Sequence, residues 1–229
     1  MKLNSKLIIL ILLISNFNFA QEQPNDFKSI ITFSTFSPLI SYAPRWNLGY
    51  IRKVDKRYWV GLELGYGSKN ISVNFAEEGG WIENDYKLFE IRPEFYYDLR
   101  PKSKLKHLLS LELFYINHSD NFKNERYFNI ENNTYYNYDT ADYKRIKYGA
   151  NINYSLIYNI TSKLALLQKI GVGIRHRDVK YSNVVNQVED LNYEGPNSFV
   201  FPVNDGFLRN EGKATAFNFN LDLKIIYKF

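Results

Sequence analysis

The chain has 229 residues, with 29 lysines and arginines, 24 aspartates and glutamates, 19 tyrosines, 17 phenylalanines and no cysteine. The missing cysteine excludes disulfides, thiolate metal ligands, a cysteine nucleophile and a lipoprotein anchor. An aromatic fraction of 17% excludes a disordered chain, because so much ring area has to be buried against something. The net charge of +5 raises the question of a nucleic-acid or membrane-surface partner.

The first twenty residues have the order of a signal peptide. Lys2 and Lys6 form a basic start, an apolar run follows at 7–14, and Ala20 precedes the expected cleavage point. The apolar run is far shorter than the ~20 residues that a membrane-spanning helix needs. A buried N-terminal helix is the alternative. We predict that residues 1–20 are a signal peptide and that 21–229 form a single domain outside the cytoplasm.

Most of the remaining chain alternates between apolar and polar residues, which is the period of a strand with two different faces. In the clearest run, every odd-numbered residue from Phe217 to Phe229 is apolar. The runs lie, in chain order, at 29–37, 46–50, 58–66, 89–99, 109–115, 146–160, 164–174 and 217–229. The two faces of the first run cannot be told apart. Pro93 lies inside the fourth run and predicts a bulge or a weakened strand pair, because proline has no N–H to donate.

The links between these runs alternate in length. Short links lie at 53–56, 100–106 and 161–162, and long polar links lie at 69–85, 119–142 and 178–212. The link at 38–44 is brief, and its two prolines predict a bend. The two short turns at 52–57 and 100–106 are basic, whereas the long links are acidic. Eight strands with this alternation place both termini on the short-turn side, as in a bacterial outer-membrane barrel.

A soluble barrel such as a lipocalin also alternates, but its apolar face points inward. Here the polar face carries glycines and charges of both signs, which fits a crowded polar lumen. The apolar face often has aromatic rings at its ends, as in the run from Tyr58 to Tyr66, which spans roughly 26 Å at ~3.3 Å per residue. Both features favour a barrel whose apolar face contacts lipid.

The charged residues on the polar face are the predicted site, a lumen charge network. They are Glu63, Glu90, Arg92, Glu94, Glu112, Lys147, Lys169, Arg175, Asp222 and Lys224. We expect them to form a paired ladder that plugs the interior, since an eight-stranded barrel is only wide enough for side chains. The alternative is a gated pore or a proton path.

The sequence contains no motif that predicts catalysis, a cofactor or a metal. Its three histidines, His107, His118 and His176, lack metal-ligand spacing. His118 and Ser119, with Glu112 below, resemble the Ser/His/Glu set of outer-membrane lipid A deacylases, but adjacent residues of a strand point to opposite faces. We predict no catalytic, cofactor-binding or metal-binding residue. The sequence contains no basic stripe and no segment that resembles a DNA- or RNA-binding domain, so it does not predict a nucleic-acid partner.

The last strand resembles a known family signal. The segment 221–229 ends in Phe229 with Tyr227 two residues before it, and this looks like the C-terminal signal by which outer-membrane barrels are recognised for insertion. Lys224 stands where a glycine is often found. With the signal peptide and the eight runs, the chain resembles small outer-membrane β-barrel proteins of the OmpA/OmpX kind. The junction at 19–21 and the segment 48–53 look like Bacteroidota members.

The resemblance implies an all-β fold, an eight-stranded antiparallel transmembrane β-barrel with an up-and-down meander. It also implies an outer-membrane location, contact with outer-membrane lipid and lipopolysaccharide, and the barrel-assembly machinery as a partner during insertion. It does not imply one function. We expect a structural or surface-interaction role through the long loops, with an envelope protein as a candidate partner. The alternatives are a PorT-like barrel subunit of an envelope or secretion machine, a narrow pore and a lipid A-modifying enzyme.

Overall fold

The computed structural model describes residues 27–39, 41–72, 82–83, 85–103, 105–190 and 210–229. The predicted signal peptide at 1–20 lies outside the described residues. No helix in the described part of the chain is both long and apolar enough to cross a membrane.

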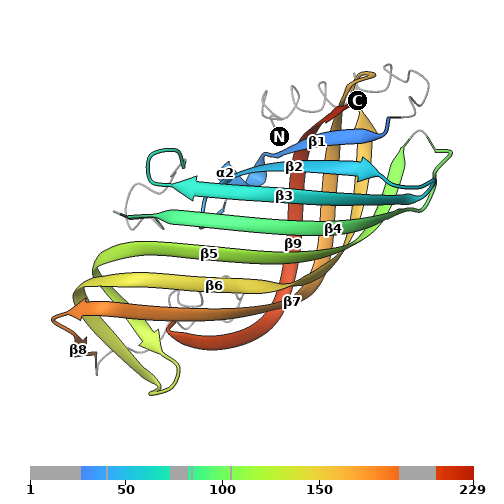
Figure 1. Ribbon diagram of the computed structural model, residues 1–229. Helices are drawn as coiled ribbons and strands as arrows, with labels where there is room; N and C mark the ends of the chain where they lie inside the picture. The colour runs from blue at the N-terminus through green and yellow to red at the C-terminus, as the bar shows by residue number, and fades with distance from the viewer. Residues whose placement is uncertain (1–26, 40, 73–81, 84, 104, 191–209) are drawn as a thin grey trace, which may run out of the picture.

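Eight antiparallel strands close into a barrel, in which each strand pairs with its neighbours in the chain and the last pairs with the first (Figure 1). They are β1 (Ser29–Ser34), β2 (Trp46–Lys53), β3 (Tyr58–Ser68), β4 (Lys87–Asp98), β5 (Lys106–Asn129), β6 (Thr134–Asn159), β7 (Leu164–Val185) and β9 (Gly212–Lys228). A two-residue strand, β8 (Val188–Glu189), pairs with β6 outside the barrel, and a short helix, α2 (Phe36–Leu39), follows β1. The backbone groups of Phe229 and Ser29 exchange two hydrogen bonds of 3.0 Å and close the ring. The predicted eight-stranded antiparallel meander is confirmed.

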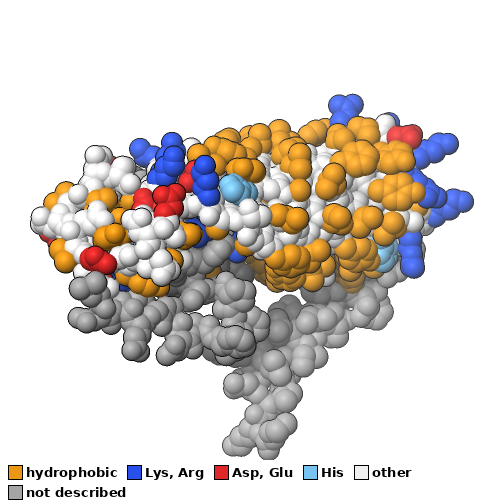
Figure 2. All heavy atoms as spheres, turned by 90° about the horizontal axis from the view of Figure 1, so that it is seen from below, with side chains coloured by type: hydrophobic (Ala, Val, Ile, Leu, Met, Phe, Trp, Pro, Cys, Tyr) orange, Lys and Arg blue, Asp and Glu red, His pale blue; other side chains and the backbone are white. Residues whose placement is uncertain are grey.

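The alternation in sequence becomes the difference between the inside and the outside of the barrel. On β3, Tyr58, Leu62 and Tyr66 are 41–51% exposed, whereas Trp59 and Glu63 face the lumen and are 3% and 6% exposed. Figure 2 shows the result on one face of the barrel as a belt of apolar side chains, with lysines and arginines at both ends of the belt, including the end where the short turns lie. The barrel thus carries apolar side chains on its outside, whereas its inside contains charged side chains such as Glu63 as well as buried apolar ones such as Trp59.

Three strands are much longer than the sequence pattern predicts. The pairing of β5 with β6 keeps one register from Lys106 and Ile157 out to Asn129 and Thr134, with Asn124 the one unpaired position; Asn124 has a positive φ of 51°. The predicted link at 119–142 is therefore mostly strand, and so is the beginning of the link at 178–212. We call the part of β5, β6 and β7 beyond the apolar belt the protruding sheet (Figure 1). Its strands are rich in Asn and Tyr and lack a continuous apolar face, which is why the sequence indicates loops there.

The first strand is shorter than predicted. The run at 29–37 forms a strand only to Ser34, because α2 begins at Phe36 and contains Pro38, which cannot donate to a ladder. β9 consequently pairs with β1 only from Lys224 to Lys228, while it pairs with β7 over its whole length. The Thr35 N–H donates to the Leu223 carbonyl oxygen at 2.9 Å, and α2 lies beside β9 above this point. The seam between the first and last strands is thus one of the two shortest pairings in the barrel, together with that of β1 and β2.

Pro93 weakens a pair, as the sequence predicts. The pairing of β4 with β5 is interrupted between Ile91 and Glu94, and it resumes in the same register. The missing N–H of Pro93 therefore removes ladder contacts without adding a residue to the strand.

Candidate functional site: the barrel lumen

The lumen is closed at the short-turn end by an apolar plug. Each of the eight barrel strands contributes to it: Ile30, Ile51, Trp59, Tyr96, Leu108, Ile157, Ala165, Leu167 and Ile226. All of them are buried, with exposed fractions of at most 4%. The ring of Phe27 packs against Trp59 with centroids 5.4 Å apart. This end of the barrel is packed like a protein core.

A layer of ion pairs lies above the plug. The Arg92 guanidinium bridges two carboxylates, Glu90 and Glu112, at 2.6 and 2.7 Å. The Lys169 ammonium bridges Glu94 and Glu112, with 3.0 Å to the latter. The Glu90 and Lys169 side chains are at most 2% exposed, so these charges have left bulk water and depend on one another.

The layer continues toward β9 and toward the link before β2. Lys224 pairs with Glu63 and lies 3.5 Å from Asp222, and Arg45 pairs with Glu90. We call the set joined by these pairs the ion-pair layer: Arg45, Glu63, Glu90, Arg92, Glu94, Glu112, Lys169, Asp222 and Lys224.

Asparagines complete the hydrogen bonding of the carboxylates. Asn47 donates to Glu63 and Glu90 at 3.2 and 2.9 Å, and Asn151 donates to Glu112 at 2.8 Å. Gly173 makes room for this arrangement, since a Cβ on it would lie 2.8 Å from the Asn151 Cα. The carboxylates thus keep several donors each, which offsets the cost of their burial.

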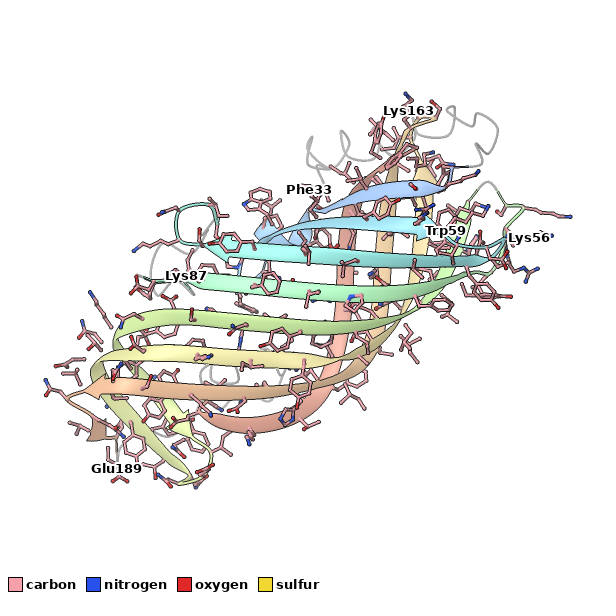
Figure 3. The ribbon with its side chains drawn as sticks, viewed as in Figure 1. Phe33, Lys56, Trp59, Lys87, Lys163 and Glu189 are labelled. Atoms are coloured by element: carbon pink, nitrogen blue, oxygen red, sulfur yellow. The ribbon has the colours of Figure 1, made fainter. Side chains whose placement is uncertain are left out.

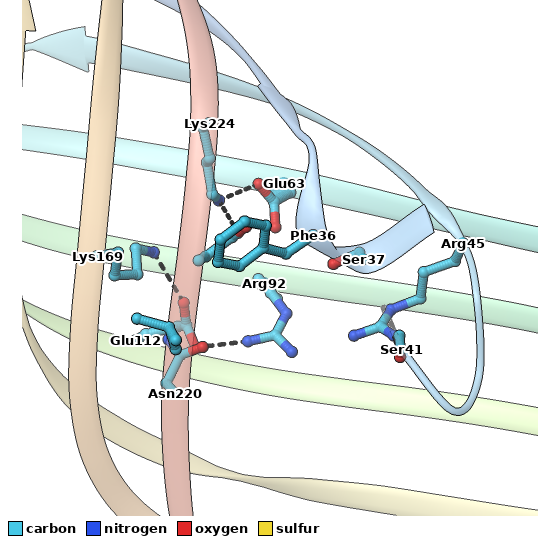
Figure 4. A pocket seen from close by; sticks show the side chains of 12 residues that line it. Phe36, Ser37, Ser41, Arg45, Glu63, Arg92, Glu112, Lys169, Asn220 and Lys224 are labelled. Carbon is cyan, nitrogen blue, oxygen red and sulfur yellow. Dashed lines mark hydrogen bonds and ion pairs between the residues drawn. The ribbon is translucent and has the colours of Figure 1, made fainter. Parts of the chain in front are cut away.

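A cavity of about 260 Å³ opens beside the ion-pair layer. Figure 4 shows it between β9 and the segment that carries Phe36, Ser37 and Arg45, with Arg92, Lys169 and Lys224 pointing toward it. The charged groups that line it belong to the ion pairs just described. The cavity is thus a polar space within the layer, beside the narrow seam of the barrel.

The structure brings eight of the ten predicted network residues into the ion-pair layer. Lys147 and Arg175 also lie on the lumen strands, but nearer the protruding sheet and outside these pairs. Sequence reasoning missed Arg45 as a member. In the sequence, Arg45 alternates with the polar-face residues Asn47 and Gly49, and this was the only sign that it faces the lumen. Its partner Glu90 lies 45 residues away, so no local pattern could show the pair.

The outer lumen, above the ion-pair layer, is rich in cations. Arg145 on β6 lies opposite His118 on β5, and Lys147 lies opposite Arg177 on β7. Arg145, Arg177 and His118 are 5%, 2% and 4% exposed. Basic side chains are therefore buried on three adjacent strands in this part of the lumen.

The histidines do not form a catalytic set. The His118 ring lies between Tyr86 and Tyr143, with centroids 5.0 and 5.1 Å away, and neither ring nitrogen has a hydrogen-bond partner. His107 accepts or donates one hydrogen bond with Tyr154 at 2.6 Å, and His176 one with Thr215 at 2.9 Å. In the part of the chain that the structure describes, no cluster of three or more His, Asp or Glu side chains could hold a metal ion.

The protruding sheet is held together by aromatic rings. Phe122, Tyr127, Tyr138, Tyr143 and Tyr181 are buried together with Ala141 and Val179. Tyr127 stacks on Tyr181 with centroids 4.3 Å apart and an interplanar angle of 12°. Burial raises the pKa of Tyr127 to about 12. The sheet therefore has its own small core outside the barrel.

No protein-family model matches the chain, and no curated protein matches it. Several solved structures are similar to it, including the following two. The first is a major outer membrane protein from Thermus thermophilus, with 14% identity, a TM-score of 0.41 and coverage of 88% of this chain and 98% of that one. The second is CarO from Acinetobacter baumannii, with 10% identity, a TM-score of 0.42 and coverage of 91% of this chain and 100% of that one.

Proposed function

We propose that this protein is an outer-membrane β-barrel with a structural or surface-interaction role. The observation that carries the proposal is the inverted arrangement of the barrel, with an apolar belt outside and buried ion pairs inside. Leu48, Leu111 and Ile152 of the belt are 52–59% exposed, although no loop or helix covers them in the described structure. Such a continuous apolar surface is stable in lipid, and a closed barrel satisfies the backbone hydrogen bonds that lipid cannot.

The filled lumen supports a role other than transport. The apolar plug closes the short-turn end, and the ion-pair layer lies above it with a cavity of about 260 Å³. Because the charges of this layer pair with one another, their presence in the lumen does not require a channel through the barrel. The protruding sheet, with its own aromatic core, then becomes the part of the molecule that is available for contacts outside the cell. A narrow pore would show channel events in a planar lipid bilayer, and we expect none from the wild-type protein.

Single-cysteine labelling tests the location and the orientation, because the chain has no cysteine of its own. Glu131→Cys places a thiol at the tip of the β5–β6 hairpin, and Lys56→Cys places one in a short turn at the opposite end of the barrel. Figure 3 labels Lys56 at one end and Glu189, beside the protruding sheet, at the other. We expect an impermeant maleimide to label position 131 in intact cells and position 56 only after the outer membrane is opened.

The same labelling can contradict the proposal. Equal labelling of both positions in intact cells, labelling of position 56 alone, or recovery of the protein in the soluble fraction would each overturn it. Lipid and lipopolysaccharide are the surroundings that the apolar belt would meet. Tyr227 and Phe229 lie on that belt, 42% and 57% exposed, where the barrel-assembly machinery could recognise them before the barrel closes.

A second candidate function is that of a barrel subunit in an envelope machine. It is favoured by the basic short turns: Lys56 and Arg57 follow Lys53 at the end of β2, and Arg100 and Lys102 lie between β4 and Lys106 at the start of β5. These would face the periplasm and could dock on an acidic partner. Crosslinking in cells followed by purification should then recover a partner through the turns, and charge reversal at Lys56 and Lys102 should abolish its recovery.

A further inference from the structure

The outer lumen contains cationic side chains on adjacent strands. β6 presents Arg145 and Lys147 to the lumen, and β7 presents Arg175 and Arg177. The strand register places Lys147 directly opposite Arg177. Like charges that face each other across a ladder destabilise a sheet. The Arg177 Nη1 donates a hydrogen bond to the Asn210 carbonyl oxygen at 2.7 Å, so the two cations of β6 are the ones that matter for a ligand.

The two cations of β6 have no acidic partner among the described residues. No ion pair joins Arg145 or Lys147 to a carboxylate there. The Arg145 side chain is 5% exposed, and its Nε is buried without a hydrogen-bond acceptor. A buried guanidinium that lacks an acceptor differs sharply from those of the ion-pair layer, where each has a carboxylate.

The nearest acidic side chain on the lumen face of β5, that of Asp120, already accepts other hydrogen bonds. Asp120 lies one lumen position beyond His118, and its carboxylate accepts the backbone N–H groups of Glu83 at 2.8 Å and Asp85 at 3.1 Å. It therefore holds the backbone at Glu83 and Asp85, just before β4. The charged groups that act most strongly on Lys147 are four guanidinium groups, those of Arg145, Arg92, Arg175 and Arg45, and all of them repel its ammonium.

Aromatic rings border the outer lumen on its inner and outer sides. The Phe114 ring lies between the outer lumen and the ion-pair layer, with its centroid 5.4 Å from the Lys147 ammonium and 5.3 Å from the Arg92 guanidinium carbon. On the outer side, Phe122 and Tyr143 of the protruding sheet pack with ring centroids 5.1 Å apart. Lys147 itself is half-buried. The region is thus a set of cations bounded by aromatic rings on two sides.

We propose that the outer lumen binds a phosphate group, held by Arg145 and Lys147 with Arg177 beside them. A guanidinium offers two parallel N–H donors that match two oxygens of a phosphate, and an ammonium adds a third donor and a second charge. A dianion neutralises two neighbouring cations at once, which a carboxylate does not. The phosphate group can come from free inorganic phosphate or from a phosphorylated lipid headgroup at the mouth of the barrel.

The test uses the full-length folded barrel in detergent micelles and inorganic phosphate as the probe. Titration calorimetry should show one phosphate bound per chain. The unfolding temperature should rise with phosphate concentration at constant ionic strength, because a ligand that binds only the folded state stabilises it. Replacing the phosphate by chloride should not reproduce the rise.

The double variant Arg145→Gln and Lys147→Gln should bind phosphate at least 10-fold more weakly. Its matched control, Lys56→Gln and Lys102→Gln, removes two lysines from the short turns and should bind like the wild type. Without phosphate, the Arg145/Lys147 variant should unfold at the same temperature as the wild type or higher, because it loses repulsion. If it fails to fold, the single variant Lys147→Gln carries the same expectation.

Two results would overturn the proposal: no phosphate binding by the wild type, or equal binding by the wild type and the Arg145/Lys147 variant. A third arm separates the sources of the phosphate. Micelles that contain lipid A with its phosphates should displace inorganic phosphate if the headgroup reaches the site, and dephosphorylated lipid A should not. Binding of inorganic phosphate without such displacement assigns the site to a soluble anion. None of these measurements depends on the location of the protein in the cell.

Discussion

The inner and outer halves of the lumen use similar side chains in opposite ways. In the inner half, Lys169 is buried, Arg92 is half-buried, and each bridges two carboxylates. In the outer half, Arg145 is buried too, yet it faces other cations and no carboxylate of the described residues pairs with it. Burial alone therefore does not show what a charged side chain does. The inner charges have their partners within the fold, whereas for the outer ones we have proposed a phosphate ligand.

The largest effect is expected from the loss of an inner cation. Arg92→Ala leaves Glu90 and Glu112 with fewer positive partners in a buried site, and removal of one member of a buried pair costs about 3–5 kcal/mol. The folded barrel should lose its heat-resistant electrophoretic mobility at a lower temperature. Lys147→Ala in the outer half is the matched control and should leave that temperature unchanged or raise it. If Arg92→Ala left this temperature unchanged, the inner cations would not stabilise the fold in the way that distinguishes them from the outer ones.

The plug should respond as a core does. Trp59 is 3% exposed, and truncating a buried aromatic residue to alanine costs about 3–5 kcal/mol at most sites. In Trp59→Ala we expect a lower unfolding temperature and, in a planar bilayer, brief channel events that the wild type lacks. Tyr58→Phe changes the neighbouring residue on the outer face and should leave both properties as they are. Steady conductance from the wild type would contradict a closed lumen.

A smaller and local effect is expected in the protruding sheet. Tyr127 stacks on Tyr181, and such aromatic pairs contribute about 0.5–1.5 kcal/mol beyond the area that they bury. Tyr127→Ala should make the β5–β6 hairpin more sensitive to protease while the barrel keeps its unfolding temperature. Loss of the barrel itself in this variant would show that the sheet and the barrel fold as one unit.

The smallest effect concerns pH. Asn183 and Asn121 donate hydrogen bonds to the Asp142 carboxylate at 2.7 and 2.9 Å, and these bonds lower its pKa below the usual 3.8. Because the folded state holds the ionised form, this stabilisation is present above about pH 4 and is lost as the pH falls through the lowered pKa. Hydrogen exchange of the hairpin should therefore speed up at low pH. Asp142→Asn should remove that pH dependence, whereas Asp139→Asn, on the same strand, should leave most of it.

The sequence by itself determined the barrel and its inversion. Runs such as 146–160 alternate with a period of two. Lysine, glycine and asparagine fall on one face and aliphatic and aromatic residues on the other, which indicates strands with one apolar and one polar side. The alternation of short and long links then orders them as a meander. It also placed Glu63, Arg92 and Lys224 on the lumen side, because parity along a strand fixes the face.

Only the tertiary structure decided which charges meet. Lys224 and Glu63 are 161 residues apart, and closure of β9 onto β1 places them on facing walls of the lumen. Parity could not separate Lys147 from Lys169, since both lie on the same face, and their height along the barrel depends on the register between strands. The sequence pattern did not predict the full lengths of β5, β6 and β7 for a related reason. Their outer parts are stabilised by rings from three strands, such as Tyr127 and Tyr181, and not by an apolar pattern within any one of them.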